Sequence, residues 1–139
     1  MALTITATQV LPGAGATIVR YIAAAGVTIT AGQTIYDTTG SRVAGLADAD
    51  ASAASSLCVG IALNGASPGQ PVDVLTDGII TLGAGAAPVN GIPYFVSPTA
   101  GTIAVLAEVL TGDAVVYLGV GIGSNRVAVK IHLTAAVAQ

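Results

Sequence analysis

Few residues in this chain have side chains able to do acid–base or nucleophilic chemistry, and they are spread along its length. His132 is the single histidine, Cys58 the single cysteine and Lys130 the single lysine. A Ser–His–Asp relay or a zinc site needs several such groups to converge on one place. No recognisable catalytic spacing joins these residues, so the sequence predicts a protein that is not an enzyme and has no catalytic residue.

The surroundings of His132 and Cys58 favour structural roles for both. His132 lies in the alternating run Val129–Leu133, where it shares a face with Lys130 opposite the apolar side chains. This spacing predicts a solvent-facing or interface histidine. Cys58 lies in an apolar run and is expected to be a buried small hydrophobic residue. A single cysteine also excludes a disulfide within the chain.

Metal and cofactor sites have equally weak signals. Asp48 and Asp50 could touch a calcium ion, but they do not form the EF-hand pattern and are interpreted as solvated loop charges. Three glycine-rich stretches begin a GxG, at residues 13, 83 and 119, but none continues as GxGxxG into a helix. The sequence therefore predicts no metal site and no cofactor.

The composition limits the partners of the chain. Its 139 residues fit one domain, of which 53% are hydrophobic and only 8% charged, against about 25% charged in ordinary soluble domains. We therefore expect partners to cover much of the surface. The four cations are scattered, which argues against direct binding of nucleic acid. The longest apolar stretch, residues 114–123, is shorter than the roughly 20 residues of a spanning helix, so no membrane partner is expected.

The elements that hold these residues are predicted to be strands. Short runs rich in β-branched residues are cut by Gly, Pro, Asn and Asp at intervals typical of a sandwich or barrel. Residues 47–56 are expected to form a loop or a one-turn helix. Asp77-Gly78 favours a tight hairpin between strands at 71–75 and 79–82. The predicted fold class is all-β: a compact β-barrel or sandwich built from two related β units, with an extended N-terminal arm.

The two units are indicated by an internal repeat. Gly32–Tyr36 recurs as Gly91–Phe95 at an offset of 59 residues. Val59–Ile61 is matched to Val120–Ile122 at 61, and Val72–Val74 to Val127–Val129 at 55, which implies one shortened loop. We predict one domain overall, with an N-terminal arm and first strands over residues 1–26 and a duplicated β domain over residues 27–139. No repeated segment contains a paired catalytic group, so the repeat indicates a structural role for these segments.

The order of these and further sequence segments resembles that in the small capsid decoration, or cement, proteins of tailed bacteriophages. The resemblance covers most of residues 27–133 and lies in the order of its elements, namely Ala31–Tyr36, Val59–Ala62, Pro68–Val74, Thr76–Gly78, Val89–Tyr94, Leu118–Gly121 and Val127–Ile131. The family often has an acidic residue before the proline of the second unit, where this chain has Ile92.

This resemblance implies a structural virion protein, made in the host cytoplasm and placed on the outer capsid surface. It implies a homotrimer that bridges subunits of the major capsid protein and so stabilises the head. The alternating N-terminal segment would then extend and pair with a neighbouring chain or with the capsid. The candidate interface residues are Leu3, Thr4, Ile5, Thr6, Ala7 and Thr8.

An alternative function is a carbohydrate- or receptor-binding β domain of a virion fibre or surface layer. Such domains bind sugars through exposed aromatic rings. The rings of this chain are expected to pack inside strands instead, and they are Tyr21, Tyr36, Tyr94, Phe95 and Tyr117.

Overall fold

The structure, a computed structural model, is all-β as the sequence predicts. It describes residue 5 and residues 7–49, 55–83, 88–109, 113–123 and 125–137. Within these residues there are ten strands, two short 3-10 helices and no α-helix, so none of the described helices could span a membrane. The elements are η1 (Ala7–Gln9), β1 (Leu11–Pro12), β2 (Thr17–Ala23), β3 (Thr34–Asp37), β4 (Val43–Leu46), β5 (Cys58–Ala62), β6 (Pro71–Thr81), β7 (Pro93–Val96), β8 (Ile103–Ala104), η2 (Leu106–Glu108), β9 (Ala114–Gly123) and β10 (Arg126–Val137).

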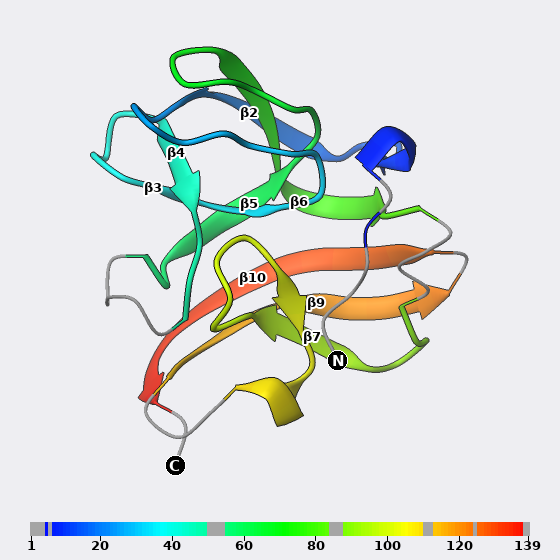
Figure 1. Ribbon diagram of the computed structural model, residues 1–139. Coiled ribbons are helices and arrows are strands. Elements are labelled where there is room, and N and C mark those ends of the chain that lie inside the picture. Colours follow the sequence, from blue (N-terminus) through cyan, green and yellow to red (C-terminus); the bar gives the residue numbers. More distant parts are fainter. Residues whose placement is uncertain are drawn as a thin grey trace.

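Five of the strands close into a small barrel. Their order is β2-β4-β3-β5-β6, and antiparallel pairing of β2 with β6 closes the ring. Ile22 of β2 lies beside Val43 of β4 in the one parallel pairing among the described strands. In Figure 1 this barrel forms the upper part of the molecule.

The remaining strands form a second sheet beneath the barrel (Figure 1). Its order is β10-β9-β7-β8, and it joins the barrel because the second half of β6 pairs with β10. The two-residue strand β1 also pairs with this half of β6. One long strand therefore belongs to both parts, its first half to the barrel and its second half to what we call the second sheet.

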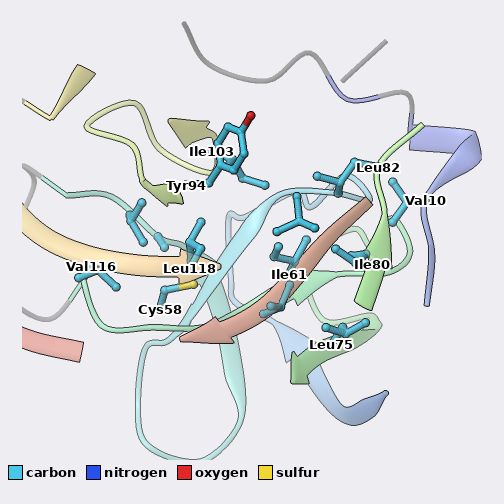
Figure 2. Close-up of a cluster of buried hydrophobic side chains, with 14 of the residues drawn as sticks. Val10, Cys58, Ile61, Leu75, Ile80, Leu82, Tyr94, Ile103, Val116 and Leu118 are labelled. Carbon is cyan, nitrogen blue, oxygen red and sulfur yellow. The ribbon is translucent and has the colours of Figure 1, made fainter. Parts of the chain in front are cut away.

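Two hydrophobic cores follow from this layering. The smaller core fills the barrel and includes Ile35, Ala44 and Val74. The larger core lies between the barrel wall and the second sheet, so we call it the shared core. Figure 2 shows it, with Ile61 and Leu75 from the barrel wall and Leu118 from the second sheet. Residues from both halves of the chain fill this one core.

The repeat predicted from the sequence is present in the strand pairing. In the first unit, Ile35 pairs with Gly60, and a bulge separates this pair from Tyr36. In the second unit, Tyr94 pairs with Gly119, with a bulge at the same place. All matched positions differ by 59 residues. The two units are thus β3 to β6 and β7 to β10.

The turn that enters each unit repeats as well. The Gly32 N–H donates to the Ala62 carbonyl at 2.8 Å, and the equivalent Gly91 N–H donates to the Gly121 carbonyl at 2.7 Å. Gly32 and Gly91 have φ angles of 93° and 83°, a region that glycine enters without strain.

The predicted alignment of the later repeated segments, Val59–Ile61 and Val72–Val74, with the second unit was wrong by two residues. Ile61 pairs with Leu75 in the first unit, and Val120 pairs with Ala128 in the second, which sets the offsets at 59 for β9 and 53 for β10. Gly60 therefore corresponds to Gly119 rather than to Gly121. A slip of two leaves every side chain on the same face of a strand, so alternation alone could not detect it. The shortened loop itself is confirmed, because β9 and β10 are joined by a connection six residues shorter than that between β5 and β6.

The predicted hairpin at Asp77-Gly78 is also wrong. Both residues lie inside β6, which runs from Pro71 to Thr81 without a turn. A Cβ on Gly78 would stand 2.8 Å from the Cα of Ala16, and its φ is 114°. Glycine is needed here because the chain before β2 approaches β6 closely, not because the chain reverses.

Most other predicted elements are confirmed. The sequence pattern also predicts strands at residues 27–30 and 102–106, and the structure differs at both. Residues 27–30 contribute only a single bridge from Ile29 to Ala66, and the second strand ends at Ala104, after which η2 follows. Ala47–Ala49 and the described residues 55–56 contain no helix, and residues 50–54 lie outside the described part.

Candidate functional site

The residues with potential for chemistry do not converge. His132 is exposed on β10, and its ring centroid lies 5.8 Å from that of Tyr117. Cys58 is buried on β5, where desolvation raises the pKa of its thiol to about 12. Among the described residues, no group of three or more His, Cys, Asp or Glu side chains could hold a metal ion. Asp50 lies outside the described residues, so the structure does not test the interpretation of Asp48 and Asp50 as solvated loop charges.

The turn between β3 and β4 is built around one carboxylate. Asp37 accepts hydrogen bonds from the backbone N–H groups of four residues, Thr39, Gly40, Arg42 and Val43, at 2.9 to 3.3 Å. Desolvation raises the pKa of Asp37, but the four backbone hydrogen bonds together outweigh it and leave the pKa below its ordinary value. This carboxylate is occupied in holding its own turn.

A shallow hollow of about 230 Å³ lies beside the turn that enters β3. Its lining provides hydroxyl and amide groups but no ionisable side chain, and consists of Ile5, Thr30, Ala31, Gly32, Gln33, Gly101 and Thr102. The Ile5 side chain already lies against Gly32.

The N-terminal candidate interface is only partly described. Leu3, Thr4 and Thr6 lie outside the described residues. Ile5 and Ala7 pack against the shared core of their own chain, and Thr8 is exposed in the 3-10 helix η1. The helix η1 begins within the segment that the alternating sequence predicted to be extended. The interface role of this segment stays a prediction.

The outward side of the second sheet has an apolar row that crosses four strands. Ile79 of β6 pairs with Ala128 of β10, which pairs with Val120 of β9, which pairs with Pro93 of β7. Cross-strand partners point to the same face, so the four side chains form one line, which we call the outer row. Ile79 and Pro93 are exposed and the two central residues are half-buried. Leu11 of β1, 61% exposed, extends the same face beyond β6.

Aromatic rings form a second row beside the first. Phe95 pairs with Tyr117, and Tyr117 pairs with His132. The Phe95 and Tyr117 ring centroids lie 6.0 Å apart in an edge-to-face arrangement. Of the other tyrosines, Tyr21 and Tyr94 are buried.

Charged groups border the outer row. Lys130 and Asp77 are cross-strand partners whose charged atoms are 4.0 Å apart, both largely exposed. Arg126, partner of Thr81, has a buried Nε without a hydrogen-bond partner among the described residues. The rows and these three residues together are here called the outer face.

The same row exists in the first unit, where it is covered. Thr34, Ile61 and Leu75 are cross-strand partners equivalent to Pro93, Val120 and Ala128, and all three are fully buried. The second sheet packs on Ile61 and Leu75 through the shared core. The same row of positions is therefore buried in the first unit and partly exposed in the second.

Comparison with protein-family models, with curated proteins and with solved structures finds no match for this chain.

Sequence reasoning missed the outer face. The signal available was the repeat itself, since the buried residues Ile61 and Leu75 have apolar counterparts, Val120 and Ala128. Alternation indicates that such residues share a face, but the layer that covers the face in one unit and not in the other depends on tertiary packing.

Proposed function

We propose that the protein is a structural virion protein that decorates the outer surface of a bacteriophage capsid and stabilises it by bridging major capsid subunits. The observation that carries the proposal is the coincidence of the resembling motifs with the structural repeat. Residues 31–36 and 89–94 enter equivalent strands, and residues 59–62 and 118–121 supply the strands that pair with them. The resemblance thus rests on the architecture of both units rather than on one short motif.

The surface chemistry supports a protein that works while covered by partners. Only 8% of the residues are charged, and the outer face leaves an apolar row open to solvent. Apolar area removed from water contributes about 25 cal/mol per Å² before the cost of association. A trimer that spans joints between capsid subunits would add such contacts at every symmetry-related joint.

Imaging of phage heads tests this proposal. Heads made without the protein, from the phage that encodes it, are mixed with the purified chain and examined by electron cryomicroscopy. We expect added density on the outer surface at joints between major capsid subunits, and heads that release their DNA at a higher temperature. Heads that already contain the protein are the control and should gain no density. Absence of binding to the deficient heads would refute the proposal.

One observation favours the alternative, a carbohydrate- or receptor-binding domain. Tyr117 is half-buried on the outer face between Phe95 and His132, so part of this residue is accessible to a ligand. Glycan binding by the purified chain that is lost in Tyr117→Ala, with no binding to deficient heads, would support this alternative over decoration.

A further inference from the structure

We infer that Asn90 is a site of spontaneous deamidation in the folded protein, where its side-chain amide is converted to a carboxylate. Two asparagines of the chain are each followed by a glycine, as Asn64-Gly65 and Asn90-Gly91. Glycine in this position favours the reaction, because it leaves the backbone nitrogen that attacks the side chain unhindered. The structure holds the two pairs in opposite ways, and this difference selects Asn90.

The reaction needs only water and hydroxide. The Gly91 backbone nitrogen loses its proton to hydroxide and attacks Cγ of Asn90. A bond from this nitrogen to Cγ forms, the bond from Cγ to Nδ2 breaks, and ammonia leaves. Water then opens the resulting succinimide ring at one of its two carbonyl carbons. Opening at Cγ gives aspartate, and opening at the backbone carbonyl carbon gives isoaspartate, in which the chain continues through the side chain.

The Asn90 side chain is free to take part in this reaction. Asn90 is exposed in the turn that enters β7, and its side chain has no hydrogen-bond partner among the described residues. A Cβ on Gly91 would meet no atom within 4 Å, so the space beside the attacking nitrogen is open. One hydrogen bond restrains this nitrogen, from the Gly91 N–H to the Gly121 carbonyl at 2.7 Å. It precedes the first residue of β7, at a strand end, where local opening costs least.

The Asn64 side chain, by contrast, is held at both of its polar atoms. Its Nδ2 donates to the carbonyls of Gly65 and Pro71 at 2.9 and 3.3 Å. Its Oδ1 accepts a hydrogen bond from the Asp73 N–H at 2.8 Å. The amide must turn toward the Gly65 nitrogen and release Nδ2, so the reaction sacrifices these three hydrogen bonds. Because each is a net stabilisation, losing three costs more than opening the one at Gly91.

The internal repeat shows that this turn does not need an asparagine. In the second unit the Ile92 N–H donates to the Val89 carbonyl at 3.2 Å, and in the first unit the Gln33 N–H donates to the Thr30 carbonyl at the same distance. The residue equivalent to Asn90, 59 positions earlier, is Ala31. Asn90→Ala therefore places in the second turn the residue that the first turn already has, and it removes the reactive amide.

Deamidation at this position alters the border of the outer face. Both products place a new negative charge three residues before Pro93, the end of the outer row. Isoaspartate also adds one carbon to the backbone of a turn that two hydrogen bonds hold, from Ile92 to Val89 and from Gly91 to Gly121. The charge and the entry to β7 would thus change as the protein ages. This inference goes beyond the decoration function, because the reaction needs no capsid.

Peptide mapping of the full-length chain tests the assignment. The folded protein is incubated in mildly alkaline buffer and samples are digested with pepsin at acidic pH, which stops further deamidation. Trypsin is unsuitable, because no lysine or arginine lies between Asn64 and Asn90 to separate them. Mass spectrometry measures deamidation at each site, and chromatography separates aspartate from isoaspartate. We expect Asn90 to react about tenfold faster than Asn64, or more, because two additional hydrogen bonds protect Asn64.

Two controls separate structure from sequence. In the urea-unfolded chain both Asn-Gly pairs should react at similar rates, because no hydrogen bond then distinguishes them. Asn90→Ala should remove the signal at residue 90 and leave the rate at Asn64 unchanged in the folded protein, with far-UV circular dichroism confirming the fold.

Equal rates at the two sites of the folded chain, or faster reaction at Asn64, would overturn the inference. It would also be overturned if Asn90 stayed intact in the folded chain over the time that converts the unfolded chain, or if urea left the difference between the sites unchanged. Failure of the chain to bind deficient heads would refute the decoration function and leave these results unaffected.

Discussion

At the scale of single residues, the chain uses its few charges to hold the backbone. Asp37 accepts four backbone hydrogen bonds within residues 37–43, so one carboxylate organises the whole β3–β4 turn. In this turn Arg42 has a φ of 62°, a left-handed conformation that is rare for residues other than glycine. Its equivalent in the second unit, 59 residues on, is Gly101, with a φ of 77°. The two units therefore have a left-handed residue at the same position of this turn, but the residue type differs.

Because the pKa of Asp37 is lowered in the folded chain, the free energy of unfolding depends on pH in the acidic range. Because the pKa is lower in the folded than in the unfolded chain, the stabilisation is present above about pH 4, the unfolded value. It is lost as the pH falls through the folded pKa. Asp37→Asn is expected to lower the free energy of unfolding at pH 7 by about 1 kcal/mol, a small value because the site is solvent-screened. The variant should also show a flatter dependence of stability between pH 5 and pH 2, measured by urea denaturation.

Asp73→Asn is the matched control for this measurement. Asp73 forms an exposed ion pair with Arg20 at 3.0 Å, and exposed pairs contribute little. An equal loss in both variants would contradict the role given to the Asp37 hydrogen bonds.

At the scale of elements, each unit depends on one glycine where three strands meet. A Cβ on Gly60 would collide with the carbonyl of Leu75, and a Cβ on Gly119 would collide with the carbonyl of Ala128. These carbonyls are at equivalent positions on β6 and β10. Both glycines also lie next to the bulge of their unit. The same close approach of strands has therefore been kept in both repeats.

Alanine at either glycine should be strongly destabilising. The added methyl group meets backbone atoms that cannot move without breaking strand pairing, so we expect Gly60→Ala and Gly119→Ala each to cost about 1–3 kcal/mol or more. Gly65→Ala is the control, since its Cβ would meet only the Ile29 carbonyl at 3.4 Å. Chemical denaturation of the three variants measures the difference. Similar losses at Gly65 and at the two strand glycines would show that the close approach is not the cause.

Much of this element pattern could be predicted from the sequence. Runs of β-branched residues cut by glycine predict strands at residues 17–22 and 58–63, within one residue of the observed Thr17–Ala23 and Cys58–Ala62. Such predictions succeed because alternation and turn chemistry are local. Gly78 misled the prediction, since glycine serves both tight turns and close approaches and only the position of Ala16 distinguishes them. The repeat indicates the apolar residues of the outer row, but which of the two equivalent rows stays open could not be predicted, because it depends on which layer lies above each row.

At the scale of the whole molecule, the layers are the barrel interior, the barrel wall, the shared core and the second sheet. The shared core draws on both units, with Ile61 from one and Leu118 from the other. Neither unit can bury this surface without its partner. We therefore expect the chain to unfold as one cooperative domain despite its internal repeat.

Truncation of one side chain in the shared core should weaken both units together. Ile61→Ala is expected to lower the free energy of unfolding by about 2–5 kcal/mol, because Ile61 is fully buried. Amide hydrogen exchange should show the same loss of protection at Val72 in the barrel as at Leu118 in the second sheet. Ile22→Ala, at an exposed barrel position, is the control and should cost far less. Loss of protection in only one unit would contradict a single cooperative domain.

The pairing of Asp77 with Lys130 places opposite charges at a position where a dimer of two identical units could not have them. The offset of 53 residues makes these positions equivalent, and they face each other where the last strands of the two units meet. If the units were identical subunits of a dimer, this position would meet its own image, and a carboxylate would confront a carboxylate. Joining both units in one polypeptide allows the central position to hold opposite charges, so the junction has an asymmetry that no homodimer of the unit could have.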